Sequence, residues 1–419
     1  MQLMPLAVKS LVNRRVTVVL TVITIAFSVM LLLGVEKVRT GARESFSNTI
    51  SGTDLIVGAR SGRIQLLLNS VFRIGNPSAN VSWEGYQDIA ALPEVAWAVP
   101  ISMGDSHKGF RVVGTSTDYF THYQYGRKQE LNFKRGGPFD DLFDAVLGAD
   151  VANSLRYRIG DKIELTHGMD SVGLHHHEDK PFTVSGILAR TGTPVDRAVF
   201  ISLKGLEAVH ADWIGGAHLP GDTLSAEQVR QLKLTPDSVS AILIGLKSRR
   251  TAIFLQPTIN GYREEPLLAI MPGVTLQELW DAIGTAQSAL MIISILVFFT
   301  GLMGMVTMTL AGLNERRREM AILRSVGARP IHIFGLLTTE AGMLASFGTV
   351  LGLMILYITL IAIQPLIAAR YGLYIAVSPP MLKEIFIIAI IVLSGFLAGL
   401  VPAYRAYRFT LADGMIIQN

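Results

Sequence analysis

The 419-residue sequence contains no cysteine, so it offers neither disulfide bonds nor thiol chemistry. Charged residues are also scarce, because Asp, Glu, Lys and Arg together make up only 17% of the chain. Half of the residues are hydrophobic, the mean hydropathy is +0.41, and the apolar residues are gathered into long runs. The composition is too apolar for a typical soluble protein and indicates a membrane protein.

Sequence motifs that mark common enzymes are missing too. The chain has no G-x-x-x-x-G-K-[ST] loop to bind nucleotide phosphates, no H-E-x-x-H and no G-x-S-x-G. No pairing of a nucleophile with a base stands out. We therefore predict that the chain alone is not an enzyme.

Four apolar runs are each long enough to cross a hydrocarbon core of about 30 Å. They are Val16–Val35, Ala286–Leu313, Ile331–Leu366 and Ile385–Val401. The first run is too long for a secretory signal peptide and no small-residue cleavage site follows it, so it reads as an uncleaved anchor. Runs three and four carry Gly348-x-x-x-Gly352 and Gly395-x-x-x-Gly399, spacings that allow close helix packing.

Lysine and arginine near the ends of the runs predict the orientation. Lys9, Arg14 and Arg15 precede the first run, five arginines lie between the second and third, and Arg405 and Arg408 follow the fourth. The connection between the third and fourth runs holds only Arg370 and Lys383. The positive-inside rule then places both termini in the cytoplasm. The net charge of +4 lies beside the membrane, so lipid headgroups explain it better than nucleic acid does.

The long segment between the first two spans predicts an external domain. Its sequence alternates short strand and helix patterns at both ends, and residues 141–235 are richer in strands. The expected fold is therefore an α-helical membrane protein with four transmembrane helices and a large α/β (α+β) periplasmic domain inserted between helices 1 and 2. That domain is expected to have two lobes, with the strand-rich region inserted into one α/β lobe.

The expected boundaries follow from these patterns. They are a cytoplasmic interfacial helix at 1–15, the first span at 16–36, the periplasmic domain at 37–280, a stalk plus second span at 275–313, a cytoplasmic helix at 314–330, the third span at 331–366, a short periplasmic loop at 367–384, the fourth span at 385–402 and a cytoplasmic tail at 403–419.

The stalk is the rigid connection in this prediction. Residues 275–290 show helical spacing with few breakers and run directly into the second apolar run, so one helix from 275 to 313 would be roughly 55 to 60 Å long. The stalk positions that carry its large apolar side chains are Leu276, Leu279, Trp280 and Ile283.

The stretch Leu313–Pro330 between the second and third spans predicts one short basic helix. Good helix formers are followed by Gly327, which suits a C-terminal cap, and Pro330 prevents continuation. The residues predicted to couple to an ATPase are Glu315, Arg316, Arg317, Arg318, Glu319, Met320, Leu323 and Arg324. A charged helix with one apolar side suits docking into a groove of a partner protein. The alternative is a solvated basic loop that obeys the positive-inside rule.

The histidine-rich loop and Glu340 each allow a functional and a purely structural interpretation. A loop of the external domain concentrates His167, His175, His176, His177, Glu178 and Asp179, side chains that bind Zn²⁺ or Cu²⁺. The alternative is a solvated polar loop, because the run has no established ligand spacing. Glu340 is an acid inside the third apolar run, where an interhelical hydrogen bond explains it as well as a proton or gating role does.

Several motifs together resemble the FtsX-like permease family. They are NERRREMAILRSVGARPIHI, the acidic Glu340 that follows it, and PAYRAYRFTLADGM after the fourth span. AVLGADVANSLRYRIGDKIEL and PFTVSGILARTGTPVDRAVFISL resemble the MacB-like periplasmic core domain of the same proteins. These are the membrane subunits of type VII, mechanotransmitting ABC transporters of the LolC/LolE and MacB types.

The resemblance implies that residues 315–326 form a coupling helix on an ABC ATPase and that 275–290 form the stalk. It implies two ATPase copies, a second permease copy or a paralogue, and a periplasmic adaptor or substrate protein as partners. ATP and Mg²⁺ would be bound by the ATPase, a separate subunit, and the location would be the bacterial inner membrane. The expected function is transmission of ATP-driven motion to the periplasm, acting on a lipoprotein, peptide or metal-related substrate. The alternative is a transmembrane signalling complex that activates a periplasmic partner.

Overall fold

The computed structural model describes residues 14–167, 180–211, 213–214, 217–218, 224–315, 320, 322, 324–325, 327–371 and 377–408. The chain forms two compact units. The helical unit comprises Met1–Gly41, Gly284–Leu366 and Ile375–Asn419, and the sheet unit comprises Ala42–Ile283 and Ile367–Tyr374. The interfacial helix predicted at 1–15 lies almost wholly outside the described residues.

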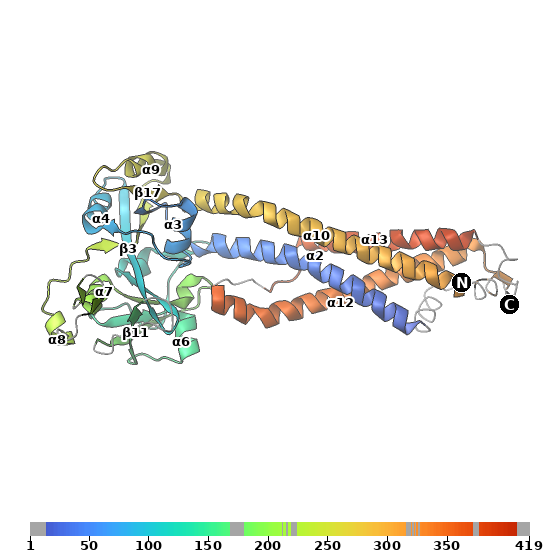
Figure 1. The fold of residues 1–419 in the computed structure, drawn as a ribbon, viewed down its shortest axis with the longest axis horizontal. Coiled ribbons are helices and arrows are strands. Elements are labelled where there is room, and N and C mark those ends of the chain that lie inside the picture. Colours follow the sequence, from blue (N-terminus) through green and yellow to red (C-terminus); the bar gives the residue numbers. More distant parts are fainter. Residues whose placement is uncertain are drawn as a thin grey trace. The chain divides into compact units, whose positions relative to one another are not determined.

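The sheet unit is built around a mixed sheet of eleven described strands (Figure 1). The strands of this sheet are β1 (Leu55–Ala59), β3 (Val95–His107), β4 (Phe110–Thr115), β7 (Phe133–Gly136), β8 (Asp144–Leu147), β9 (Lys162–Ile163), β10 (Thr166–His167), β11 (Phe182–Leu188), β12 (Ala198–Ser202), β16 (Ala241–Leu246) and β17 (Leu267–Ile270). Their order is β17-β1-β16-β3-β4-β12-β8-β11-β7, while β10 pairs with β3 and β9 pairs with β11. The pairs β11–β8 and β12–β4 are parallel.

Short helices and small two-stranded sheets complete this unit. The helices are α3 (Arg63–Ser70), α4 (Trp83–Ala90), α5 (Asp118–His122), α6 (Ala149–Leu155), α7 (Leu203–His210), α8 (Ala226–Val229) and α9 (Ala252–Asn260), with 3-10 turns at Pro194–Arg197 and Arg249–Thr251. The paired short strands are β2 (Val81–Ser82) with β15 (Ser238–Val239), β5 (Gln124–Tyr125) with β6 (Gln129–Glu130), and β13 (Trp213–Ile214) with β14 (Ala217–His218).

Apolar side chains alternate between the two faces of the sheet, as the two-residue period of a strand requires. In β1, Ile56 faces one cluster with Leu67 of α3, whereas Leu55 and Val57 face a second cluster with Leu255 of α9. A third cluster covers the same face as the second, around α6 and α7. One face therefore carries a continuous core, and the other carries two separate cores. The predicted two lobes accordingly share a single sheet.

Two strands differ from the sequence-based expectation. The sequence pattern indicates a short strand at 95–101, but β3 continues to His107 because it pairs in turn with β16, β4 and β10. The residues IGDKIELTHG alternate as one strand would, but the structure divides them into β9 and β10. The reason is that the chain changes partner there, with Ile163 pairing on β11 and Thr166 on β3.

The helical unit is built from four helices, each long and apolar enough to cross a membrane within the described part of the chain. They are α2 (Arg15–Thr49), α10 (Pro272–Glu315), α12 (Pro330–Tyr371) and α13 (Leu382–Tyr407). The expectation of four transmembrane helices with an α/β domain between the first and second is therefore confirmed. The helices α2 and α10 extend beyond their apolar runs and continue into the residues of the sheet unit.

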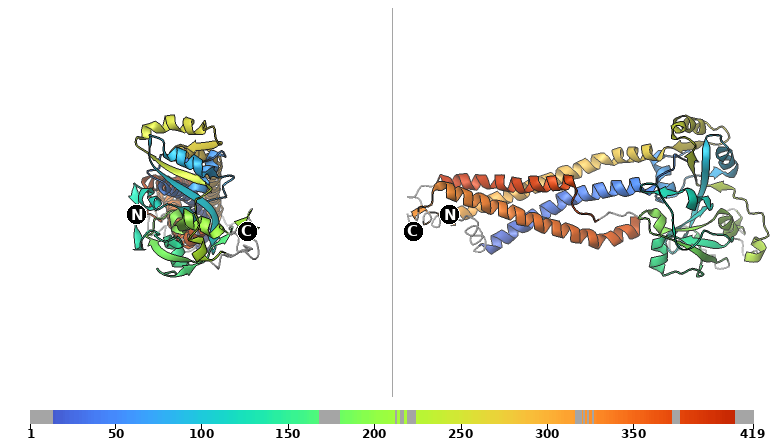
Figure 2. Two further views of the ribbon diagram at one scale, coloured as in Figure 1. Left: turned by 90° about the vertical axis from the view of Figure 1, so that its left-hand side faces the viewer. Right: turned by 180° about the vertical axis from the view of Figure 1, so that it is seen from behind.

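Glycines bring these helices together, as their spacing predicts. A Cβ on Gly352 would lie 2.6 Å from the Ala26 carbonyl oxygen of α2, so α12 and α2 are in backbone contact there. A Cβ on Gly395 of α13 would lie 2.1 Å from the Cβ of Ala345 on α12. Only a residue without a side chain permits either approach. The four helices run alongside one another in both side views (Figure 1; Figure 2, right) and share one apolar core.

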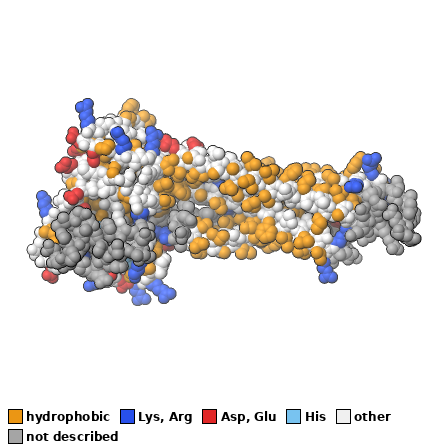
Figure 3. Space-filling view, viewed as in Figure 1, with side chains coloured by type: hydrophobic (Ala, Val, Ile, Leu, Met, Phe, Trp, Pro, Cys, Tyr) orange, Lys and Arg blue, Asp and Glu red, His pale blue; other side chains and the backbone are white. Residues whose placement is uncertain are grey.

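The outer surface of the helical unit is apolar (Figure 3). Leu382, Phe386 and Ile358 are 88%, 68% and 67% exposed. Exposure of such large apolar side chains is unfavourable in water but not in lipid. Exposed apolar side chains occur on all four helices, among them Phe27 of α2, Leu296 of α10, Ile358 of α12 and Phe386 of α13. This surface fits a lipid environment.

Candidate functional site

The predicted coupling stretch lies at one end of the helical unit, between the end of α10 and the start of α12. Glu315 is the last residue of α10. Arg316, Arg317, Arg318, Glu319 and Leu323 lie outside the described residues. Met320 is only 8% exposed and packs with Leu313 and the ends of α12 and α13, so its side chain belongs to the bundle rather than to a free docking edge.

Gly327, which follows the predicted coupling helix, has the backbone conformation of a helix C-terminal cap. Gly327 has φ of 96° and its N–H donates to the carbonyl of Arg324 at 3.0 Å, so glycine supplies the left-handed conformation that closes a helix. Pro330 is the first residue of α12, where its missing N–H costs no hydrogen bond.

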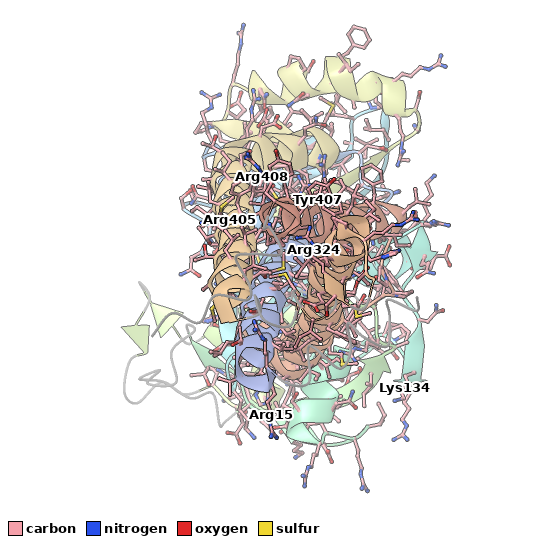
Figure 4. All side chains as sticks on the ribbon, turned by 90° about the vertical axis from the view of Figure 1, so that its right-hand side faces the viewer. Arg15, Lys134, Arg324, Arg405, Tyr407 and Arg408 are labelled. Carbon is pink, nitrogen blue, oxygen red and sulfur yellow. The ribbon has the colours of Figure 1, made fainter. Side chains whose placement is uncertain are left out.

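Arginines gather at this end of the helical unit. Figure 4 looks onto it and labels Arg15, Arg324, Arg405 and Arg408 there; Lys134, also labelled, belongs to β7 of the sheet unit. Arg14 donates to the carbonyl of Gly312, one of the last residues of α10, at 3.3 Å. The C-terminal ends of α10 and α13 carry partial negative charge, which favours cations at this position. Exposed arginines here suit an acidic or anionic partner surface.

The opposite ends of α2 and α10 are embedded in the sheet unit. The ring of Phe46, near the end of α2, lies 4.3 Å from that of Phe72 and 5.5 Å from that of Trp280, edge to face. Of the predicted stalk residues, Leu279 is 9% exposed, Leu276 packs against the main core cluster, and Ile283 is 38% exposed. All four stalk residues belong to the sheet unit, and Leu276, Leu279 and Trp280 are packed there while Ile283 is exposed.

Hydrogen bonds fix the end of α2 to the segment after α5. The N–H of Gly126 donates to the carbonyl of Asn48 at 2.7 Å, and the N–H of Ser51 donates to the carbonyl of Gln124 at 2.8 Å. The hydroxyl of Tyr123 donates to the carbonyl of Thr49. Complete burial raises the pKa of Tyr123 well above its usual value, so this hydroxyl keeps its proton and remains a donor.

From there a polar network crosses the core to the turn before β12. Tyr119 stacks on Tyr123 at 4.9 Å, and burial raises the pKa of Tyr119 to about 12. Arg73 donates to the Tyr119 hydroxyl at 3.1 Å and to the carbonyl of Pro194, while its guanidinium lies over the ring of Phe200. The end of α2 is thus linked to the far half of the sheet through side chains with fixed partners.

A second cluster of polar side chains lies within the helical unit, where the apolar run of α2 ends. Glu36 accepts from Lys383 at 2.6 Å and from Arg39 at 2.9 Å. The neighbouring Lys37 donates to Glu384 at 3.2 Å. We call the crossed pairs Glu36–Lys383 and Lys37–Glu384 the outer clasp.

Comparison with known proteins assigns the family. The model of the MacB-like periplasmic core domain matches residues 18–250, more than half of the chain, and that of the FtsX-like permease C-terminal matches residues 291–411. The chain belongs to the FtsX/MacB-like permease family.

Individual relatives of this FtsX/MacB-like permease are more distant. The macrolide export ATP-binding/permease protein MacB of Nitrobacter winogradskyi is 23% identical over 408 residues, which cover 93% of this chain and 56% of that protein. The chain therefore spans about half the length of this curated relative. The periplasmic region of MacB from Actinobacillus actinomycetemcomitans is 11% identical with a TM-score of 0.34, covering 55% of this chain and 94% of its own. The extracellular domain of the noncanonic ABC-type transporter YknZ from Gram-positive bacteria is 12% identical with a TM-score of 0.31, covering 52% and 98%.

The family and the four apolar helices together make the chain a multi-pass inner-membrane protein of the ABC permease type. The homologues are permease components of ABC transporters.

The predicted zinc ligands of the permease fall mostly outside the described residues. His167 ends β10, paired with Asp105 of β3, and its side chain is not described. His175, His176, His177, Glu178 and Asp179 lie outside the described part of the chain. Within that part, no three metal-binding side chains converge. The zinc site stays a prediction.

The sequence analysis did not identify the outer clasp or the aromatic contacts of Phe46 with Phe72 and Trp280. A signal for the clasp existed, because acid–base pairs of opposite order, Glu36-Lys37 and Lys383-Glu384, flank the first and fourth apolar runs. Phe46 carried no such signal, since its partners Phe72 and Trp280 are distant in sequence. Glu340, which the sequence singled out, is 5% exposed within α12.

Proposed function

We propose that the chain is the membrane subunit of a mechanotransmitting ABC transporter, in which ATP hydrolysis on a separate subunit moves the external domain. The observation that carries this proposal is the continuity of α2 and α10. Each is one unbroken helix of 35 and 44 residues, apolar along one part and anchored in the core of the sheet unit at its other end. A continuous helix transmits displacement along its axis, because each turn is joined to the next by hydrogen bonds.

The basic end of the helical unit is the proposed docking surface for an ABC ATPase. Arg405 and Arg408 are exposed at the end of α13, and Arg329 is exposed just before α12. We expect Arg316, Arg317 and Arg318, which lie outside the described residues, to add to this positive surface. We place this end, and both chain termini, in the cytoplasm. Two ATPase copies and a second permease copy or paralogue complete the assembly, and ATP with Mg²⁺ belongs to the ATPase.

The sheet unit is the proposed working part in the periplasm. Its buried links from Thr49 through Tyr123, Tyr119 and Arg73 to Pro194 join the end of α2 to the far half of the sheet. A displacement of α2 is thereby shared with the strands that are not adjacent to it. Lipoproteins, peptides, metal-related compounds and the macrolides in the name of the relative are the substrates to test, with an adaptor or substrate protein as partner.

Copurification tests the docking surface. We expect Arg317→Glu combined with Arg318→Glu to abolish copurification of an ABC ATPase, since two favourable charge contacts become repulsive. The matched control is Arg43→Glu, an exposed arginine of α2 outside that surface, which should leave copurification unchanged. Unchanged tryptophan fluorescence reports an intact sheet unit, because all four tryptophans lie within it.

An ATPase that still binds the doubly reversed protein contradicts the docking role. A periplasmic hydrolase that copurifies tightly with the unmodified chain would favour the signalling alternative instead, because an exporter holds its substrate only transiently.

A further inference from the structure

The outer clasp joins two helices that are distant in sequence. It lies entirely within the helical unit, between α2 and the N-terminal turn of α13. Glu36, Lys37 and Glu384 are 2%, 5% and 7% exposed, so three charges are buried where the apolar runs end. Charges removed from water are costly unless they are paired and hydrogen-bonded. Such a cluster therefore needs a physical reason.

Lys37 has all of its hydrogen-bonding capacity used. Its ammonium donates to Glu384 at 3.2 Å and to the carbonyl and hydroxyl of Ser378 at 3.0 and 3.2 Å. The ring of Tyr357 on α12 lies 5.9 Å away, and its hydroxyl donates to the same Ser378 carbonyl. Glu384 also accepts from the N–H of Met381, which caps α13. Lys37 thus ties α2 to the capped end of α13.

Glu36 is less well satisfied. Its Oε1 accepts from Lys383 and Arg39, whereas its buried Oε2 has no hydrogen-bond partner among the described residues. An unsatisfied buried carboxylate oxygen reduces the stability that the pair contributes. Net stabilisation is therefore a poor explanation for the clasp, and a specific geometry is a better one.

The apolar contacts between the membrane helices do not fix that geometry by themselves. Lipid tails are as apolar as leucine, so an apolar side chain loses little when one helix slides or turns against another. The clasp is sensitive to such movement. A screw of α13 by one residue, about 1.5 Å and 100°, would bring Glu384 toward Glu36 and separate Lys37 from its carboxylate.

We propose that the outer clasp sets the register of α2 against α13 and that Glu36, Lys37, Lys383 and Glu384 are positioning residues for transmission of motion. This inference rests on the proposed function, because register matters only if α2 carries displacement. With the clasp closed, α13 and α2 move as one body, and movement that enters at the basic end of α13 reaches the sheet unit through α2.

The absence of cysteine permits a direct measurement. Val38→Cys with Phe386→Cys places spin labels at exposed positions of α2 and α13 in the full chain, reconstituted in lipid nanodiscs. We expect one narrow distance distribution between the labels. Adding Glu36→Lys should broaden it or add a longer distance, because Lys383 then faces a like charge. Adding Lys383→Glu as well should restore the narrow distribution, and the control Arg43→Glu, exposed on the same helix, should leave it unchanged.

A second variant distinguishes a role of the clasp in the register of α2 and α13 from a role in stability. Lys37→Met with Glu384→Gln removes both charges while glutamine retains the acceptor that caps α13. We expect the thermal midpoint to stay level or rise, since well-packed neutral replacements of buried ion pairs often stabilise, while the distance distribution broadens. A lowered midpoint with an unchanged narrow distance would overturn the inference, and so would a narrow distance in the folded Glu36→Lys protein.

The two proposals fail in different ways. If the unmodified chain binds no ATPase, the proposed function fails whatever the label distances are. If the ATPase binds and the labels report the same distance with the clasp intact and reversed, the proposed function stands and the positioning role of the clasp is wrong.

Discussion

The helical unit and the sheet unit place their apolar and charged side chains in opposite locations. In the helical unit, Leu382 and Phe386 are exposed while Glu36 and Lys37 are buried. In the sheet unit, Phe200 and Val146 are fully buried, and charged residues such as Arg63 reach solvent. The same principle gives both results, because each unit turns toward its surroundings the side chains that those surroundings solvate. The difference teaches that hydrocarbon surrounds one unit and water the other.

The two units also differ in what holds them together. The sheet unit is stabilised by removal of apolar area from water, which amounts to about 25 cal/mol per Å². The helical unit gains little from that effect, so it depends on close backbone contact at glycines and on polar links such as the outer clasp. Substitutions in the two units should therefore fail by different mechanisms.

The largest expected loss of stability comes from a substitution in the hydrophobic core of the sheet unit. Phe200→Ala should lower the free energy of unfolding of the sheet unit by about 3–5 kcal/mol, because the buried ring contacts Tyr119, Phe120 and Arg73 and leaves a cavity. Denaturant titration followed by tryptophan fluorescence measures it. The control Phe254→Ala removes a ring that is 77% exposed and should change stability by less than about 0.5 kcal/mol. Equal losses for the two would contradict the assignment of this core.

The next effect tests the glycine-packed core. Gly352→Leu should separate α12 from α2, because the added Cβ meets the Ala26 carbonyl at 2.6 Å and backbone cannot give way as a flexible side chain can. Overpacking of this kind costs about 1–3 kcal/mol. Gly304→Leu is the matched control, since nothing lies within 4 Å of a Cβ on Gly304. Unfolding in mixed detergent micelles should distinguish the two, and equal stability would argue against helix contact at Gly352.

The sequence predicted the features that depend on local pattern. The four spans, the cap at Gly327 and the close packing at Gly352 and Gly395 all follow from residue type and spacing within one segment. The single sheet did not follow, because β1 lies between β16 and β17, whose paired residues are 183 to 214 positions away in the sequence. Register between distant strands is set by long-range packing rather than by any local motif.

The candidate site shows the same division. The stalk residues Leu276 and Trp280 could be found from helical spacing, but their partner Phe46 could not, since its role depends on how α2 meets α3 in space. The sequence predicted that the apolar side of the coupling stretch faces a partner protein. Met320, on that side, instead packs against the other helices of the bundle. Sequence spacing identifies an apolar face but not the surface that covers it.

The third-largest effect is expected at Trp280, where α10 packs into the hydrophobic core of the sheet unit. Trp280→Ala should destabilise the sheet unit by roughly 1–2 kcal/mol, because the half-buried ring loses its edge-to-face contact with Phe46 and part of its burial. The three remaining tryptophans report unfolding. Arg63→Ala, which removes the exposed ion pair to Glu278 in the same region, should cost at most about 1 kcal/mol. A larger loss for Arg63→Ala than for Trp280→Ala would show that charge, not aromatic packing, anchors α10.

The smallest expected effect is the pH dependence of the stability of the sheet unit, through His210. Burial lowers the pKa of His210, but the Asp105 carboxylate, 3.6 Å from its Nε2, and the Leu206 carbonyl, 2.9 Å from its Nδ1, raise it above the ordinary 6.5 on balance. Both ring nitrogens face acceptors, so the folded sheet unit favours the imidazolium. A pKa raised by folding gives stability that is fully present below the unfolded value and is lost as pH rises through the folded one. The stability difference between the unmodified chain and His210→Gln should therefore be largest below pH 6.5 and shrink above it. A difference that grows with pH would mean that His210 is neutral in the folded protein.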